Sequence, residues 1–249
     1  MKVIAAQPKL VTQVHEALVS EIAQGKLRPG ERIIQEQIAQ VLGVSRQPVQ
    51  QALLLLRNQG VLHDAPGRGL MVAPMDPDYV RNMYDIRAMM EGLAFRRAAE
   101  LNAAFARKLG PVLIRTGRDT LASGSLAALI AADLAFHRQV HELSRNPLIA
   151  PMMETQWIYT QRVMGEVLLR DMAPQDIWSQ HEAMLEAVME SDGDAAESLA
   201  RQHITRAADI VVERLRSDAC DRPAATTRRP ATDAHDTLNS MMRNFQCQA

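Results

Sequence analysis

Four residues with metal-ligating side chains fall on the inward faces of three predicted helices. Asp133 and His137 are four residues apart, so they share one helix face and continue its apolar stripe. His181 and His203 lie within the apolar stripes of two later helical segments. Burying a carboxylate without a partner is costly, and a divalent cation would remove that cost. The pattern predicts a metal site of one carboxylate and three imidazoles, with Zn expected first and Mn or Ni also tolerated.

A second group of residues could contact DNA. Ser45 has the chemistry of a helix N-cap, and a helix that starts there would direct its first backbone N–H groups toward phosphate. Arg46 in the first turn could bind guanine through two hydrogen bonds, and the nearby glutamines suit adenine. Arg68 lies in a glycine-rich turn that could enter the minor groove. The predicted DNA-contacting residues are Ser45, Arg46, Gln47, Gln50, Arg68 and Gly69.

The elements that must position the DNA-contacting residues are three short helices and a hairpin. Apolar spacing predicts helices over 11–22, 34–42 and 45–58. The spacing of the apolar residues then changes. Short strands are predicted over 61–63 and 70–72, on either side of a turn that contains Pro66 and two glycines. This order is typical of a winged helix-turn-helix. The alternative is a small helical domain with an incidental hairpin.

The rest of the chain is predicted to be helical until about Arg216. Roughly six helices follow Tyr79, and polar, Gly or Pro breaks separate them near 102–103, 123–124, 144–147, 172–174 and 191–193. Residues 217–249 lack a convincing period, apart from a marginal helix over 238–245. We therefore expect a mainly α chain. Its three parts are a winged helix-turn-helix at 1–75, an all-α antiparallel helical bundle at 76–216 and a flexible C-terminal tail at 217–249.

Composition narrows the class of protein. The first 75 residues hold eight basic and five acidic residues, a net charge of +3, whereas the remainder holds 20 basic and 24 acidic residues, a net charge of −4. The basic end is expected to meet a polyanion. No apolar run is long enough for a membrane span, and two cysteines cannot form a disulfide framework. These features favour a cytoplasmic protein without a membrane partner.

The segment from Pro29 to Leu53 resembles the winged helix-turn-helix of GntR-family transcription regulators. The later stretches 60–62 and 66–69 are similar to that family's wing. The chain departs from the family where Gln50-Gln51 stand in place of the usual Arg-Glu, and Gln37 occupies a position that is often Arg in the FadR branch. Fewer cationic side chains at the DNA release fewer counterions on binding. We therefore expect DNA binding to depend less on salt, and the operator to differ from that of a typical relative.

Residues 78–214 resemble the FCD effector domain of FadR-type regulators. Metal-binding members of that domain carry an Asp, a His four residues later and two further histidines, and the four residues above match that set. His141 matches no ligand position and is expected to be peripheral. The resemblance implies a carboxylate effector at the metal, with Arg87 or Arg162 as its anchor. The alternative for Arg87 is a pairing with Glu91 along its helix.

These expectations combine into a DNA-binding regulator that is not an enzyme. The resemblance implies a homodimer on near-palindromic double-stranded operator DNA, controlled by a small carboxylate or sugar acid bound at a divalent ion. One alternative is a metal-dependent enzyme that acts on a small organic acid and carries a DNA-binding appendage. Another is a regulator whose metal is purely structural.

Overall fold

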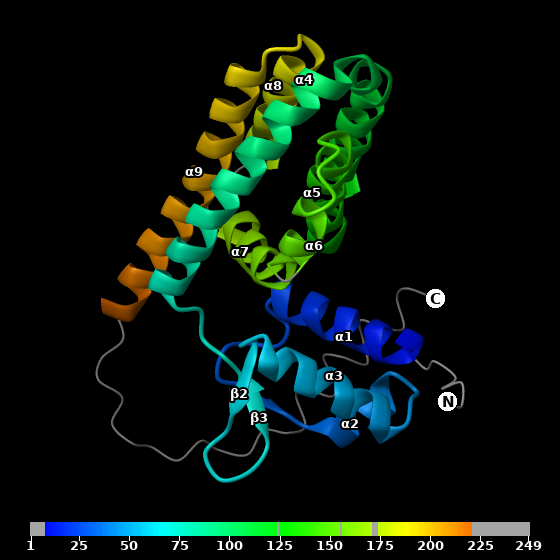
Figure 1. Cartoon of the computed structure of the whole chain (residues 1–249). Coiled ribbons are helices and arrows are strands. Elements are labelled where there is room, and N and C mark those ends of the chain that lie inside the picture. The colour runs from blue at the N-terminus through cyan, green and yellow to red at the C-terminus, as the bar shows by residue number, and fades with distance from the viewer. Residues whose placement is uncertain (1–7, 124, 155, 171–173, 221–249) are drawn as a thin grey trace. The chain divides into compact units, whose positions relative to one another are not determined.

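The computed structural model describes residues 8–123, 125–154, 156–170 and 174–220, and these are mainly helical (Figure 1). They divide into two compact units. Arg28–Pro74 form the first unit together with the start of the first helix as far as Leu18. Val19–Leu27 group with Met75–Ser217 in the second. Within the described ranges, no helix combines the length and the apolar character needed to cross a membrane.

The first unit contains the predicted helices and hairpin. Its elements are the part of α1 (Pro8–Ala23) up to Leu18, then α2 (Gln35–Val41), α3 (Arg46–Asn58), β2 (Leu62–Asp64) and β3 (Leu70–Val72). On α3 the buried residues recur at spacings of three and four: Val49, Ala52, Leu53 and Leu56. This stripe packs α3 into the unit and leaves the opposite face of the helix exposed to solvent. The prediction of a winged helix-turn-helix is confirmed.

One strand was not predicted. β1 (Arg32–Ile33) pairs antiparallel with β3, with Arg32 opposite Met71, and completes a sheet of strand order β1-β3-β2. Two residues are too short to show the alternation that marks a strand in sequence. The strand exists because β3 supplies its pairing partner.

The second unit is built from six described helices, where the sequence predicted roughly six with partly different boundaries. They are α4 (Pro77–Ser123), α5 (Leu126–Leu143), α6 (Ile149–Glu154), α7 (Trp157–Arg170), α8 (Pro174–Met189) and α9 (Gly193–Cys220). The predicted break at Asn102 is a kink inside α4, where φ is −139° and ψ is 23°. α9 continues to Cys220, four residues into the predicted tail, and Ser217 Oγ donates to the Glu213 carbonyl oxygen. The remainder of that predicted tail, including 238–245, lies outside the described residues.

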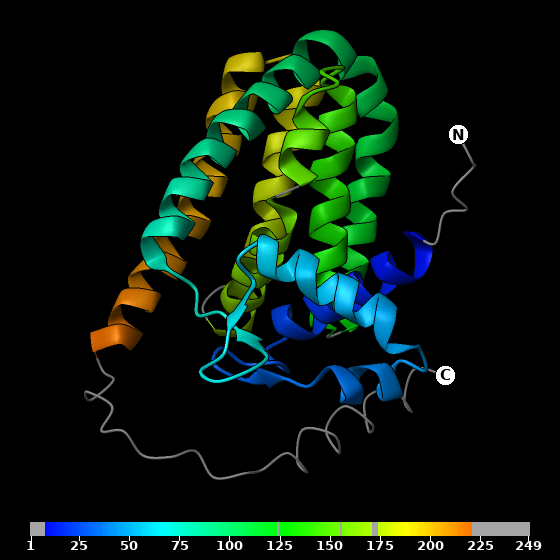
Figure 2. The same cartoon turned by 60° about the horizontal axis from the view of Figure 1, so that its bottom comes forward.

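The helices of the second unit form an antiparallel bundle. α4 contacts both α5 and α8. It runs antiparallel to α9 in both Figure 1 and Figure 2, and Arg81 on α4 forms an ion pair of 2.6 Å with Asp209 on α9. Gly117 on α4 is in contact with the indole of Trp178, in a space that a Cβ atom would fill. That indole in turn lies edge-on to His181, at 4.8 Å between ring centroids. The bundle core therefore holds one of the predicted ligands in place.

Candidate functional site

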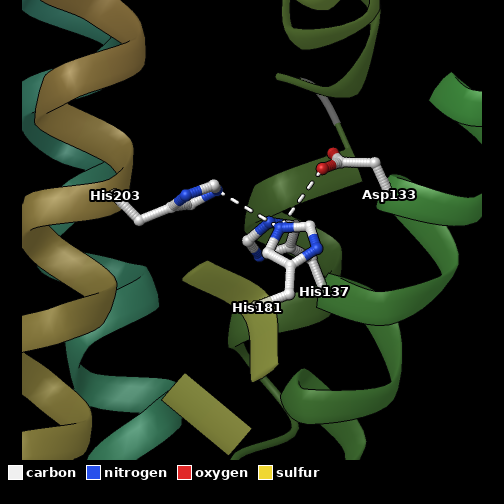
Figure 3. A group of neighbouring side chains, drawn as sticks. All are labelled: Asp133, His137, His181 and His203. Atoms are coloured by element: carbon white, nitrogen blue, oxygen red, sulfur yellow. Dashed lines mark hydrogen bonds and ion pairs between the residues drawn. The ribbon is translucent and has the colours of Figure 1, made fainter. Parts of the chain in front are cut away.

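Three helices bring the four predicted metal ligands together. α5 carries Asp133 and His137, which are 2% and 1% exposed, while α8 carries the fully buried His181 and α9 carries the partly buried His203. One ligand atom from each residue lies within 4.8 Å of every other, and Figure 3 shows the side chains pointing toward one another. Residues 70 positions apart thus share one site in the bundle.

Several polar atoms of the cluster have no hydrogen bond within the described part of the chain. Both oxygens of Asp133 and Nε2 of His137 are buried without a hydrogen bond to any described residue. Nε2 of His181 lies 3.3 Å from Oδ1 of Asp133 and 3.3 Å from Nε2 of His203. Imidazole nitrogens and a carboxylate are ligands that Zn, Mn and Ni accept. The donor set therefore fits a divalent ion, which would give each of these atoms a partner.

The surroundings keep two of the imidazoles neutral. Burial, with added repulsion from neighbouring His137, lowers the pKa of His203 to about 3. Burial and then His203 also lower the pKa of His181 well below its usual value. Burial acts in the opposite direction on Asp133 and raises the pKa of its carboxyl group. Neutral imidazoles at neutral pH have free lone pairs, so these two histidines need not lose a proton when they bind a metal.

Replacing His203 by Gln is expected to flatten the pH dependence of stability in the metal-free protein. The pKa of His203 is about 3 in the folded chain, against 6.5 for an unperturbed histidine. Below about pH 6.5 the unfolded chain therefore takes up a proton that the folded chain does not, and the wild type loses up to about 1.4 kcal/mol per pH unit from this group. Urea unfolding between about pH 7 and pH 5 would measure the slope. The contribution of Asp133 has the opposite sign and is common to both proteins, so equal slopes would contradict the expectation.

Two polar side chains contact the Nδ1 atoms of two histidine ligands. Gln180 Oε1 lies 2.9 Å from Nδ1 of His203, which leaves Nε2 of that ring free to face the cluster. Glu91 Oε2 lies 3.1 Å from Nδ1 of His137 and 3.1 Å from Nε2 of His141. His141 lies outside the group of four ligands, as predicted, yet its side chain is fully buried and its ring stacks on Trp157. The sequence suggested Glu91 only as a partner of Arg87, and it gave no signal for Gln180 beyond its place next to His181.

A small pocket opens beside the cluster. Asp133, His203 and Gln180 line it together with Arg87 and Arg206, and the rest of its wall is mostly apolar. Arg87 is buried, lies 3.5 Å from Glu91 through Nε, and sits over the ring of Tyr84 at 5.3 Å. Arg87 therefore pairs with Glu91, which was the alternative, and it also lines the pocket beside the metal ligands. Its role as an effector anchor stays a prediction.

The other predicted anchor lies elsewhere. Arg162 on α7 is buried over the ring of Tyr159, and it does not line this pocket. Arg206 was missed, although it follows His203 by three residues and so lies near it on the same side of α9. The pocket has room for about one water molecule, and it brings metal ligands next to two guanidinium groups, which attract anions.

The predicted DNA-contacting residues lie on the exposed side of the first unit. Ser45 is the N-cap of α3, but its side chain accepts no hydrogen bond there. Arg46, Gln47 and Gln50 are exposed in the first turns of α3, opposite the buried Val49. Arg46 Nη1 lies 3.0 Å from Glu36 Oε1 on α2.

The turn between β2 and β3, which forms the wing, is bound by a side chain from β1. Arg68 and Gly69 are exposed between β2 and β3, and Gly69 has a φ of +94°. The guanidinium of Arg32, on β1, donates to the backbone oxygens of Arg68 at 2.8 Å and Pro66 at 2.7 Å. Arg32 was not among the predicted residues, because its role follows from a contact 36 residues away.

Arg32→Ala is expected to weaken operator binding about threefold to tenfold. The loss of its hydrogen bonds would free the wing, and each is worth about 0.5–1.5 kcal/mol. Arg28→Ala is a matched control, since Arg28 is an exposed arginine four residues earlier whose backbone, not its side chain, bonds to Glu31. Gel-shift titrations at one salt concentration would compare the two. An equal loss of operator affinity in both variants would mean that Arg32 acts through its positive charge alone and not through its hydrogen bonds to the wing.

Two protein families match the chain. "Bacterial regulatory proteins, gntR family" matches residues 10–72, and "FCD domain" matches residues 82–206. An HTH-type transcriptional regulator in an unstable DNA locus of Streptomyces ambofaciens is 30% identical over 77% of this chain and 80% of that protein. The HTH-type transcriptional repressor RspR of Escherichia coli is 25% identical over 80% of this chain and 87% of that protein.

A solved structure shares the fold. The E. coli protein McbR/YncC superimposes with a TM-score of 0.67 at 21% identity, over 87% of this chain and all of that one.

Proposed function

Because the chain belongs to the GntR family of bacterial regulatory proteins and carries an FCD domain, we propose that a small carboxylate bound at a divalent metal in the FCD domain controls its affinity for operator DNA. The relatives named above are transcription regulators, which supports a regulator rather than a metal-dependent enzyme with a DNA-binding appendage. A protein that binds operator DNA would work in the cytoplasm, where the bacterial chromosome lies, so we propose that location as well.

The pocket beside the four ligands is the observation that carries the proposal. Asp133 and His203 would present the metal to it, while Arg87 and Arg206 add positive charge. A bound divalent ion would supply a Lewis-acidic contact for an oxygen of the effector. The buried guanidinium of Arg87 would then bind the same carboxylate, and the exposed Arg206 would face any second anionic or hydroxyl group. Small carboxylates and sugar acids fit this chemistry.

A homodimer would convert effector binding into a change of DNA affinity. The near-palindromic operators implied by the family need two DNA-binding units related by a two-fold axis. Ile86, Met89 and Leu93 are large exposed apolar side chains at helical spacing on α4, and such a stripe suits a contact between two copies of the chain. The dimer would have two arrangements of its DNA-binding units, and only one of them would match the spacing of the operator half-sites. Effector binding would shift the population from one arrangement to the other.

The proposal is tested with DNA, metal and effector in one series. The protein, loaded with Zn, Mn or Ni, is screened by thermal shift against small carboxylates and sugar acids, because a ligand of the folded state raises the melting temperature. Hits are then added to gel shifts with DNA from upstream of the protein's own gene. We expect a hit to change operator affinity, and we expect chelation of the metal to remove that change.

Arg206→Gln and Arg201→Gln provide the matched comparison. Both arginines lie on α9, but only Arg206 lines the pocket, whereas Arg201 pairs with Glu197. Only Arg206→Gln is expected to weaken the effector response. An effector response that survives chelation would favour a purely structural metal, and a metal-loaded protein that responds to no carboxylate would contradict the proposal.

A further inference from the structure

A buried carboxylate outside the ligand set joins the metal cluster to its surroundings. Glu91 on α4 is 0% exposed, and its three charged or titratable neighbours are buried as well. Oε2 lies 3.1 Å from both His137 Nδ1 and His141 Nε2, while Oε1 lies 3.5 Å from Arg87 Nε. Burying such a group costs free energy, and buried ion pairs are often no more stabilising than apolar side chains of the same size. Stability alone therefore gives little reason for a carboxylate at this place.

We infer that Glu91 is a positioning residue of the metal centre, acting through His137. Its carboxylate would accept the Nδ1 proton of His137, which fixes the tautomer and leaves Nε2 for the ion. Both ring nitrogens of His137 are buried without a hydrogen bond to a described residue, but only Nδ1 has the Glu91 carboxylate beside it, at 3.1 Å. The inference rests on the proposed metal site and adds a residue that is not one of its ligands.

The other neighbours of Glu91 hold the carboxylate in place. Nε2 of His141 is within hydrogen-bonding distance of the same oxygen that faces His137, and the His141 ring stacks on Trp157 at 5.7 Å between centroids. Arg87, one turn earlier on α4, pairs with the second oxygen through Nε at 3.5 Å, as an ion pair without a hydrogen bond. His141 therefore contributes to the site by fixing Glu91, with its Nε2 turned toward that carboxylate rather than toward the four ligands.

Cobalt binding to the full chain tests the inference without an effector. Glu91→Gln keeps the volume of the side chain and removes its charge. We expect the affinity for Co²⁺ to fall about 10- to 100-fold, a range typical for loss of such an outer partner, and the visible absorption of bound Co²⁺ to change. Glu197→Gln is the matched control, because Glu197 pairs with Arg96 and Arg201 away from the cluster. That control should bind Co²⁺ as the wild type does.

The outcomes separate this inference from the proposed function. Co²⁺ affinity and spectrum equal to those of the wild type in Glu91→Gln would overturn the role of Glu91 alone. A wild type that binds no Co²⁺ would overturn the metal site and with it the proposed function. If Glu91→Gln does not fold, His141→Gln takes its place, and a weaker Co²⁺ affinity than wild type is then expected. An unchanged affinity and spectrum in that variant would likewise overturn the inference.

Discussion

The purified wild type is expected to carry close to one divalent ion per chain, and His137→Ala is expected to lose it. His137 is 1% exposed, and its Nε2 has no hydrogen bond to a described residue, so the ion depends on it directly. Metal binding stabilises the folded chain by about 2.7 kcal/mol when the free ion is at 100 times its dissociation constant. Chelation should therefore lower the melting temperature of the wild type and leave that of His137→Ala almost unchanged. Elemental analysis and thermal unfolding, with and without chelator, measure both effects.

His63→Ala is the control for this experiment. His63 is an exposed histidine on β2, in the other unit of the chain, so its loss should alter neither the metal content nor the response to chelator. A wild type without stoichiometric metal, whose melting temperature is indifferent to added Zn, Mn and Ni, would instead mean that Asp133 and its three histidines form an ordinary polar core.

Arg46→Ala is expected to abolish specific operator binding while the protein stays folded. Arg46 is exposed in the first turn of α3, where it can reach a base edge, and a good bidentate contact is worth about 1–3 kcal/mol. Its present partner is Glu36, and the two side chains are 69% and 64% exposed. Such exposed pairs contribute little stability, so the melting temperature should hardly move. Gel shifts against specific and unrelated DNA measure the loss.

Arg57→Ala is the matched control for Arg46. Arg57 is an exposed arginine in the last turn of the same helix, where it pairs with Asp64 at 2.7 Å. The substitution removes the same charge far from the helix N-terminus. It should therefore weaken binding to the operator and to unrelated DNA by the same factor. An Arg46→Ala affinity for the operator within about twofold of wild type would contradict a role in reading the sequence.

The sequence by itself predicted the elements whose signals are local. The stripe of α3, the turn between β2 and β3 and the helices of the FCD domain all follow from apolar spacing and from Gly and Pro punctuation over a few residues. Asp133 and His137 could be assigned to one face because a helix brings every fourth residue to the same side. Together with the two later histidines on inward stripes, this predicted the cluster that the structure describes. The bound metal stays a prediction.

The tertiary structure decided what depends on contacts between distant segments. β1 exists through pairing with β3, and Arg32 reaches the wing from 36 residues away. His141 matched no ligand position, and only the structure shows that α4 places Glu91, 50 positions earlier in the chain, against it. The spacing along one helix shows which face a side chain occupies. It does not show which side chain of another helix meets that face, because packing sets the rotation and register of the two helices.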